Sequence, residues 1–431
     1  MKRRLLPILM TLVLVCALPI WAAFVTSGDV TNPLVCTAGA TSSEESAVEK
    51  LKLAISSGVD AQLTEDIEIT QTLYVERSMT IDLNGHVLKM TGDGSVLRVE
   101  EGPHPVTLTI TDSRPQNPHG SYADLPAGGV ITGGEGTDVP GIHYVGGAVY
   151  LKKGTTLKLE GGTLTGNSCS SIYIDGATFV MSGGTITGET VGVHNNVGTF
   201  TMTGGRITGC SDRGVYVYNG NMTMSGTAYI GENPNARRED IYVYESDHKH
   251  TDLSVTGGTI AGNVRIVFLE SLRPTQDELK AAANSVVKEQ GVFDGHIKVE
   301  KGTSGTCVDY NSVNFIDEVA KTRTLKLVLQ PNAVEEPETP TTVNGREFMY
   351  WAKEGASEAW DFNTVIEVPL TLYAVRTPAS SSGGYYYYQP TTDTKTTDTK
   401  GSPKTADPGV ALYAALSLLS LTGLTCTAKK Q

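Results

Sequence analysis

A Gly-Gly pair that returns at steps of 21 or 22 residues is the feature of this sequence that most restricts its fold. Full pairs begin at Gly161, Gly183 and Gly204, the single Gly226 takes the next place, and the pair at Gly257 follows after one period plus nine residues. An earlier copy begins at Gly128, one period plus an insertion before Gly161. Such a repeat is typical of a solenoid, because one unit alone cannot bury its own apolar face.

Alternation of apolar and polar residues predicts three short strands in each repeat. The residues expected to point inward from the first strand are Val149/Leu151, Ile172/Ile174, Val191/Val193, Val215/Val217 and Ile241/Val243. Those of the second strand are Leu157/Leu159, Phe179/Met181, Phe200/Met202, Met222/Met224 and Leu253/Val255, and the third strand contributes Leu164, Ile186, Ile207, Ile230 and Ile260. Three strands in about 22 residues predict an all-β chain of stacked, three-sided coils.

This pattern resembles the right-handed parallel β-helices of the pectin-lyase-like superfamily, and in particular the GG-x-I-x-G coils of bacterial surface proteins, over residues 60–270. The resemblance implies an all-β, right-handed parallel β-helix with about 22 residues and three strands per coil. An antiparallel sandwich or a propeller is the alternative fold, but neither accounts for a 22-residue step. Because this superfamily contains lyases, hydrolases and non-catalytic adhesins, the resemblance does not choose among these activities.

A solenoid needs covered ends, and two short helices are predicted to supply them. In the segment 24–59, residues 44–57 form an amphipathic pattern that starts near Ser42 or Ser43 and ends at Gly58. In the segment 271–320, a helix over residues 276–290 opens with the capping box Thr275-x-x-Glu278. We expect the first helix to cap the N-terminal coil, and the second to cap the other end or to lead into the strands that follow.

Residues 321–376 are predicted to form a small C-terminal β module. Phe348-x-x-Trp351, Trp360-Asp361-Phe362 and the strand from Leu370 to Ala374 resemble the internalin-type B repeat, a β-grasp-like unit of surface proteins. The pattern departs from that family at Tyr350, where Gly is usual, and at Val375-Arg376. Any small β domain with an aromatic core is the alternative. Residues 377–401, rich in Ser, Thr and Tyr, predict a low-complexity stalk.

Both ends of the chain resemble targeting segments. Residues 1–23 carry Lys2, Arg3 and Arg4 before an apolar run, the order of a secretory signal peptide, with an uncleaved membrane anchor as the alternative. In residues 402–431, an apolar stretch at 410–427 and two lysines follow the pentapeptide Ser402, Pro403, Lys404, Thr405 and Ala406.

This C-terminal order resembles the sortase-type sorting signals of Gram-positive surface proteins, although Ala406 stands where Gly is usual. A plain membrane-spanning helix is the alternative. The resemblance implies an extracellular protein held at the cell wall or cell-surface membrane of a Gram-positive bacterium. Its partners there would be sortase and peptidoglycan, with the membrane contacted through residues 410–427.

Charge and cysteine content exclude several kinds of partner. The formal net charge of −13 argues against nucleic acid, because affinity for nucleic acid depends on Lys and Arg that neutralise phosphates. The exported part holds Cys36, Cys169, Cys210 and Cys307, which are too scattered for a disulfide framework or a CxxC metal site. Cys169 and Cys210 are two coils apart, so we expect free thiols. No cofactor or metal is expected, and the run Asp247-His248-Lys249-His250 is interpreted as an exposed loop rather than a weak metal site.

The residue between each inward pair of the first strand must face outward, which predicts columns of side chains about 4.8 Å apart on one face. The first column is Tyr150, Tyr173, Gly192, Tyr216 and Tyr242, and the second is Lys152, Asp175, His194, Tyr218 and Tyr244. Exposed aromatic rings stack on sugar faces, and Asp and His can hydrogen-bond to hydroxyl groups, so this face is a candidate carbohydrate-binding surface. A stacking ladder that does no more than stabilise the sheet is the alternative.

The sequence therefore favours a non-catalytic adhesin, or a carbohydrate- or matrix-binding protein, whose partner is a glycan or a host or matrix surface. A purely structural surface spacer is the second hypothesis. A polysaccharide lyase or glycoside hydrolase is the third, and its candidate catalytic residues are Asp175, His194, Asp212 and Arg213. The neighbours Asp212 and Arg213 are better explained as an exposed turn with a local ion pair.

Overall fold

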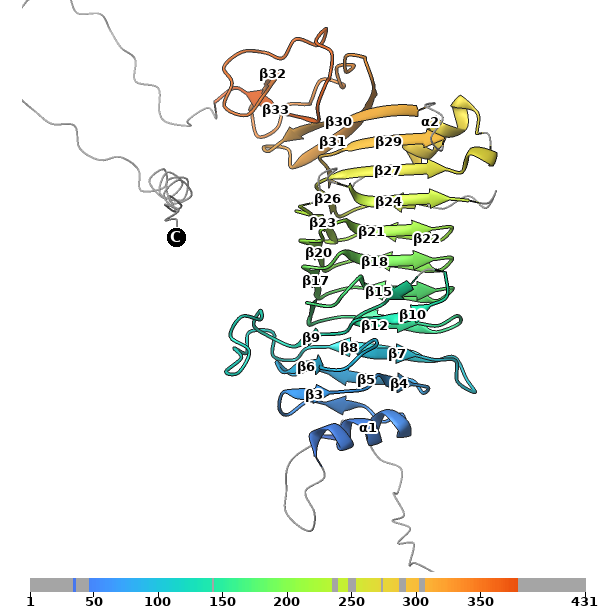
Figure 1. Ribbon diagram of the computed structural model, residues 1–431. Coiled ribbons are helices and arrows are strands. Elements are labelled where there is room, and N and C mark those ends of the chain that lie inside the picture. The colour runs from blue at the N-terminus through green and yellow to red at the C-terminus, as the bar shows by residue number, and fades with distance from the viewer. Residues whose placement is uncertain are drawn as a thin grey trace, which may run out of the picture. The chain divides into compact units, whose positions relative to one another are not determined.

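The computed structural model describes residues 34–35, 46–141, 143–234, 239–246, 253–272, 274–286, 292–301 and 307–378. In these residues the protein is mostly β, and parallel strands of successive repeats stack into three sheets, as in a parallel β-helix (Figure 1). The predicted signal peptide, the pentapeptide from Ser402 to Ala406 and the apolar stretch at 410–427 lie outside the described residues. No helix in the described part is long and apolar enough to cross a membrane.

Each sheet collects the same strand of every repeat, so we name sheets 1, 2 and 3 after the first, second and third strand of a repeat. Sheet 1 contains, in the order of the stack, β4 (Leu73–Val75), β7 (Leu97–Val99), β12 (Val149–Leu151), β15 (Ser170–Asp175), β18 (Val191–Asn196), β21 (Arg213–Tyr218), β24 (Glu239–Glu245), β27 (Asn263–Phe268) and β29 (His296–Lys301). Sheet 2 contains β1 (Leu34–Val35), β2 (Ala61–Gln62), β5 (Met79–Asp82), β8 (Thr107–Thr111), β13 (Thr156–Leu159), β16 (Thr178–Met181), β19 (Thr199–Met202), β22 (Asn221–Met224) and β25 (Leu253–Val255). Sheet 3 contains β3 (Ile67–Ile69), β6 (Val87–Met90), β9 (Val130–Thr132), β14 (Thr163–Thr165), β17 (Thr185–Thr187), β20 (Arg206–Thr208), β23 (Tyr229–Gly231), β26 (Thr259–Ile260) and β28 (Val292–Phe293).

The inward residues of sheets 2 and 3 are those that alternation predicts. In sheet 2, Leu157 pairs with Phe179, Phe179 with Phe200 and Phe200 with Met222, at steps of 22, 21 and 22 residues. In sheet 3, Leu164, Ile186, Ile207, Ile230 and Ile260 form the matching row. All of these side chains are buried in one continuous core that fills the space between the sheets. The predicted inward residues of these two sheets are thus confirmed.

Sheet 1 departs from the predicted register in one coil. Ile172 pairs with Val193, and Ile174 pairs with Asn195, so Val193 and Asn195 are the inward residues of β18. The prediction that Val193 points inward is confirmed, but its predicted partner Val191 is wrong, because Asn195 takes the second inward place with its polar groups satisfied. Its Oδ1 accepts from the Gly198 backbone N–H at 3.0 Å, and its Nδ2 donates to the Asn221 carbonyl at 2.9 Å.

The Gly-Gly pairs lie where coils stack most closely. A Cβ on Gly183 would lie 2.1 Å from the carbonyl oxygen of Glu160 in the coil below, closer than any side-chain carbon can approach. Gly184 has φ +73, a left-handed conformation that costs other residues conformational energy. The first glycine of a pair therefore permits contact between coils, and the second permits the turn into sheet 3.

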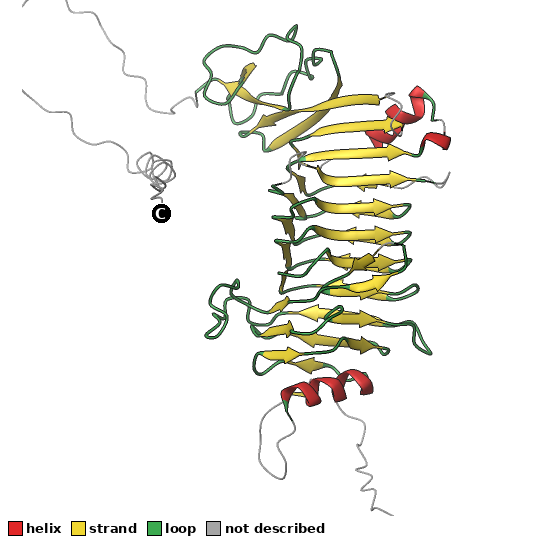
Figure 2. Ribbon diagram, viewed as in Figure 1, coloured by secondary structure: helices red, strands yellow, loops and turns green. Residues whose placement is uncertain are grey.

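The two helices lie at opposite ends of the stack (Figure 2). Helix α1 (Ala47–Ser57) begins later than predicted, with Ser46 as N-cap, and ends at Gly58 as expected, while Leu51 and Ile55 are buried against the first coil. Helix α2 (Gln276–Ser285) has the predicted capping box between Thr275 and Glu278. A short 3-10 helix (Glu270–Leu272) precedes it. Residues 287–290, the predicted end of α2, lie outside the described residues.

Sheet 1 continues beyond the last coil into the C-terminal strands. β30 (Cys307–Asp317) pairs antiparallel with β29 and with β31 (Thr322–Leu329), so these strands form one hairpin across the predicted boundary at residue 320. β33 (Leu370–Arg376) pairs parallel with β30 and antiparallel with β32 (Phe348–Ala352). Phe315, Trp351, Ile366 and Leu372 make a separate buried cluster against which Phe348, Trp360 and Phe362 pack. The aromatic residues of the predicted module therefore share one core.

Candidate functional site

The outward face of sheet 1 carries a continuous row of rings, one on each of five successive strands. We call this row the aromatic ladder; its members are Tyr150, Tyr173, His194, Tyr216 and Tyr242. Successive ring centroids are 5.3, 4.9, 4.6 and 5.4 Å apart. Arg98 lies at one end of the row, 4.8 Å from the Tyr150 ring centroid, and Arg265 continues it at the other end.

His194 belongs to this row rather than to the second column in which the sequence placed it. The shifted register of β18 puts His194, and not Gly192, between Tyr173 and Tyr216. The imidazole meets Tyr173 edge-on and lies tilted against Tyr216. Burial, together with the positive charge of Arg213, lowers the pKa of His194 to about 4, so the ring is neutral near pH 7.

Tyr150 and Tyr173 face outward from the sheet but are not exposed, contrary to the sequence-based expectation. A hairpin of β10 (Thr137–Val139) and β11 (His143–Val145) lies over them, and Val139 and Val145 pack on the two rings. Tyr173 has no accessible surface at all. The part of the aromatic ladder that reaches solvent is therefore His194, Tyr216 and Tyr242, each of which is half-buried.

A second column runs beside the open part of the ladder. It consists of Asp175, Asn196, Tyr218 and Tyr244, with Asn196 in the place expected for His194. The rings of Tyr218 and Tyr244 are parallel within 7° and 5.7 Å apart. The Ser246 hydroxyl donates to the Tyr218 hydroxyl at 3.1 Å and so fixes the end of that ring. Lys152 does not extend this column as a free cation, because its Nζ lies 3.1 Å from Glu100.

An ion-pair network closes the far end of the ladder. The guanidinium of Arg213 lies 4.2 Å from the Tyr242 ring centroid and contacts Asp212. Arg265 Nε donates to Glu300 at 2.7 Å and Nη1 donates to Glu239 at 3.1 Å. The sequence analysis missed Arg265, although it has the same place between inward Val264 and Ile266 that the ladder tyrosines have in their strands.

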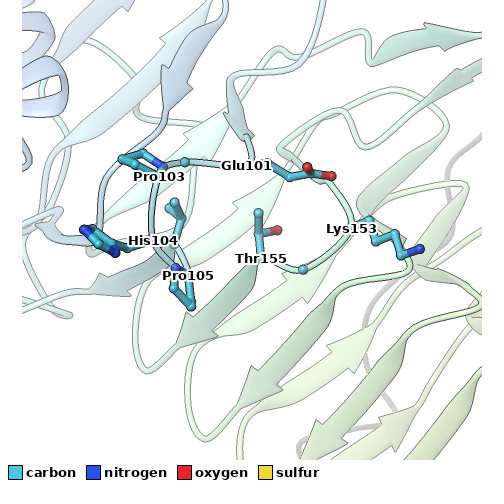
Figure 3. Close-up of a pocket in the computed structure, with 9 residues that line it drawn as sticks. Glu101, Pro103, His104, Pro105, Lys153 and Thr155 are labelled. Atoms are coloured by element: carbon cyan, nitrogen blue, oxygen red, sulfur yellow. The ribbon is translucent and has the colours of Figure 1, made fainter.

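Three hollows lie on the described surface near sheet 1, and one of them, of about 680 Å³, lies between α1 and β4 and is lined by Lys52, Leu73 and Tyr74 among others. The other two lie closer to the ladder. One, of about 430 Å³, is lined by Asn263, Arg265, His296, Lys298 and their neighbours beside the ion-pair network. The other, of about 540 Å³, lies on the turns that leave β7 and β12, and Figure 3 shows His104 and Lys153 at opposite sides of it. Its lining holds no aromatic platform, since Pro103, Pro105 and exposed polar side chains supply most of its wall.

The candidate catalytic residues do not form a single constellation. The Asp175 carboxylate accepts from the Tyr150 hydroxyl at 3.0 Å and from Asn196 Nδ2 at 3.2 Å, so both of its oxygens are engaged within the wall. Asp212 contacts its neighbour Arg213. Among the described residues, no three His, Cys, Asp or Glu side chains are grouped so that they could hold a metal ion. Residues 247–250, with the two loop histidines, lie outside the described residues.

A row of buried polar residues, Asn167, Glu189 and Cys210, lies at the corner between sheets 3 and 1 and was not predicted from the sequence. Glu189 is 1% exposed, and its carboxylate accepts from the Asn167 backbone N–H at 3.1 Å and from Asn167 Nδ2 at 3.3 Å. The buried Cys210 follows in the next coil, and Cys169 and Cys210 are free thiols, as predicted. Asn167, Glu189 and Cys210 each follow a Thr-Gly pair at the same place in successive repeats. That shared place is the sequence pattern from which the buried row could have been predicted.

Glu189 gives a prediction for the pH dependence of stability. Burial raises its pKa from 4.5 to about 7, against the hydrogen bonds from Asn167, so the folded protein holds a proton that the unfolded chain releases. The free energy of unfolding should therefore fall as the pH rises from about 4.5 to about 7, by at most about 1.4 kcal/mol per pH unit from this group. Glu189→Gln should remove this fall, as measured by urea unfolding at several pH values.

The wild-type protein is the reference in that series. The contribution of His194 to the pH dependence is the same in both proteins, so it cancels when their free energies of unfolding are subtracted. Equal slopes for the two proteins over this pH range would contradict a protonated, buried Glu189.

Comparison of the chain with models of protein families, with curated proteins and with solved structures finds no match. A function for this protein therefore has to be inferred from its fold and from the chemistry of the open ladder.

Proposed function

We propose that this protein is an exported, non-catalytic surface protein that binds glycans through the open part of the aromatic ladder. The observation that carries the proposal is a row of half-buried rings on three successive strands, at His194, Tyr216 and Tyr242, with the stacked pair Tyr218 and Tyr244 beside it. The parts of these rings that reach solvent can pack against the apolar C–H side of a sugar.

The polar edges of the same rings support this reading. In the described part of the chain, the hydroxyls of Tyr216 and Tyr242 and the ring nitrogens of His194 take part in no hydrogen bond. They can therefore donate to or accept from sugar hydroxyl groups. Rungs about 4.8 Å apart repeat at close to the length of a pyranose ring, so an unbranched β-linked chain lying along the stack would meet one rung per sugar.

The chemistry around the ladder favours binding over catalysis. Asp175 is held by two hydrogen bonds, and His194, with its lowered pKa, is a weak base. The guanidinium of Arg265 is occupied by Glu239 and Glu300. A lyase or hydrolase would need a free base or a pair of carboxylates on the same face. A structural spacer is the second hypothesis, and a polysaccharide lyase or glycoside hydrolase is the third.

We also propose where the protein is located and how its domains are organised. The signal-like residues 1–23 and the sortase-type order of residues 402–431 support export and attachment at the surface of a Gram-positive cell. The glycine repeat supports a right-handed β-helix of the pectin-lyase-like kind, with about 22 residues per coil. The shared aromatic core of residues 321–376 supports one B-repeat-like module.

Glycan binding can be tested on an array with two ladder variants. Tyr216→Ala and Tyr242→Ala should each weaken binding at least about tenfold, because each removes one stacking surface and one hydroxyl, a loss of about 1.4 kcal/mol. Tyr74→Ala is the matched control, since Tyr74 is 54% exposed in the same sheet but is separated from the open ladder by Arg98 and the covered rings.

Equal losses for Tyr74→Ala and Tyr216→Ala would contradict a site on the ladder. Absence of binding to any glycan would favour the spacer. Unsaturated products or new reducing ends from pectic, mucin-type or glycosaminoglycan substrates would favour the enzyme.

A further inference from the structure

We infer that the β10–β11 hairpin is a lid over the first two rungs of the aromatic ladder, and that the covered rings Tyr150 and Tyr173 are further glycan-binding positions. The inference rests on the proposed function, because it assigns the covered rings to the same glycan chain. With the lid open, the row of rings would lengthen from three rungs to five. The expected ligand class is an unbranched, β-linked oligosaccharide that runs along the stack.

The rings below the hairpin continue the open ladder without a break. Tyr173 lies 5.3 Å from Tyr150 and 4.9 Å from His194, measured between ring centroids. These spacings match those of the open rungs, where His194 and Tyr216 are 4.6 Å apart. A chain bound on His194 therefore meets the edge of the hairpin at the next rung.

The hairpin does not join sheet 1 but forms a two-stranded sheet of its own above it. The register of β10 and β11 places Thr137, Val139 and Val145 on the inner face. Val139 and Val145 are the apolar side chains it packs on the rings, and the Thr137 hydroxyl lies 2.9 Å from that of Ser95. Such short two-stranded pieces have little stability of their own in water.

Both ends of the hairpin carry glycines in conformations suited to hinges. Gly136 has φ +95 just before β10, and Gly146 has φ +65 just after β11. Only glycine adopts such angles readily. The Gly146 backbone N–H donates to the Ser170 hydroxyl at 3.0 Å, so rotation at this end must break that hydrogen bond. Gly136 is tethered to the adjacent turn through the Gly94 carbonyl at 3.1 Å, which keeps the base of the hairpin in place.

The covered surface also contains polar groups that water or a ligand would satisfy. The Tyr173 hydroxyl is buried under the hairpin, and its polar neighbour, the Asn196 side chain, makes no hydrogen bond of good geometry with it. A buried hydroxyl without a partner destabilises the closed arrangement relative to an open one. The Tyr173 hydroxyl is thus available to a sugar once Val139 and Val145 move away.

A reversible cross-link tests the lid. In the variant Ser95→Cys/Thr137→Cys, the two sulfur atoms replace hydroxyl oxygens that lie 2.9 Å apart, so oxidation should lock the hairpin and reduction should release it. Hydroxyl-radical footprinting then compares oxidation of the Tyr173 and Tyr150 rings with that of the core ring of Phe200. Affinity for cellohexaose and chitohexaose is measured in parallel on the same two forms, and the reduced form is the matched control.

In the reduced form we expect oxidation of Tyr150 and Tyr173 at several times the rate of Phe200, and in the locked form a rate equal to that of Phe200. We expect the locked form to bind the hexasaccharide at least about fivefold more weakly. Tyr173 protection in both forms would overturn the inference. So would opening with equal affinity in the two forms, which leaves the proposed function standing. Absence of binding of both hexasaccharides by both forms would overturn the inference, because it excludes the unbranched β-linked ligand class, while the glycan array decides the proposed function.

Discussion

Arg376→Met is expected to lower the free energy of unfolding by about 3–5 kcal/mol, because it leaves the carboxylate of Asp317 buried without its partner. The two side chains are 1% and 2% exposed. Arg376 Nε donates to Asp317 Oδ2 at 3.0 Å, while Nη1 donates to the Arg346 carbonyl and Nη2 to the Thr341 carbonyl, each at 2.9 Å. One guanidinium thus joins β30 and β33 to the segment that leads into β32.

The pKa of Asp317 agrees with that role. Burial by itself would raise the pKa of this carboxyl, but hydrogen bonds from Arg376 and from the Ala320 backbone N–H bring it below its ordinary value. The pair therefore stabilises the fold above the ordinary pKa of aspartate, and this stabilisation is lost as the pH falls through the lowered value.

Tryptophan fluorescence during urea unfolding measures this effect, because Trp351 and Trp360 both belong to the C-terminal core. Asp317→Asn/Arg376→Met is the matched control. The asparagine oxygen keeps the bonds that Asp317 accepts from Val319 and Ala320, and no charge remains buried, so at least half of the lost stability should return. A loss below about 1 kcal/mol for Arg376→Met would show that the ion pair is not buried.

Arg376 also shows what the sequence could and could not predict in this region. Its place in Val375-Arg376 was a departure from the B-repeat pattern, and no local pattern links it to Asp317, 59 residues away. The pairing follows from the parallel alignment of β30 and β33, a tertiary contact. The aromatic residues of the same region were predictable as a core because apolar rings of this size are rarely left in water.

In the β-helix, too, some inward residues could be predicted from local pattern and others depend on tertiary contacts. Alternation predicts the inward residues of sheets 2 and 3 because every one of them is apolar. It fails in β18, where the inward residue Asn195 is polar and the half-buried Val191 is apolar, since side-chain hydrogen bonds can satisfy a buried amide. That error displaced His194 by one column.

The cover on Tyr150 and Tyr173 could not be predicted either. Thr137 to Val145 appears in the sequence as an insertion between two repeats, and nothing in its own pattern tells on which face it folds back. Periodicity gives the direction in which a side chain points from its strand, and the neighbours beyond the strand decide whether it reaches solvent. The outward row of rings was therefore predicted in its place on the sheet, but its exposure to solvent was not.

Phe200→Ala should lower the free energy of unfolding by about 3–5 kcal/mol, because it removes a fully buried ring from the centre of the stack. The Phe179 and Phe200 rings are stacked within 5° of parallel, with centroids 4.9 Å apart, and the close-packed side chains around them can fill the vacated space only in part. Thr199→Ala is the matched control, since Thr199 is exposed one residue earlier in β19, and its loss should stay within about 0.5 kcal/mol. Both are measured by circular dichroism during urea unfolding. Because a shift of register by one residue would turn Phe200 outward and Thr199 inward, a larger loss for Thr199→Ala than for Phe200→Ala would refute the register of sheet 2.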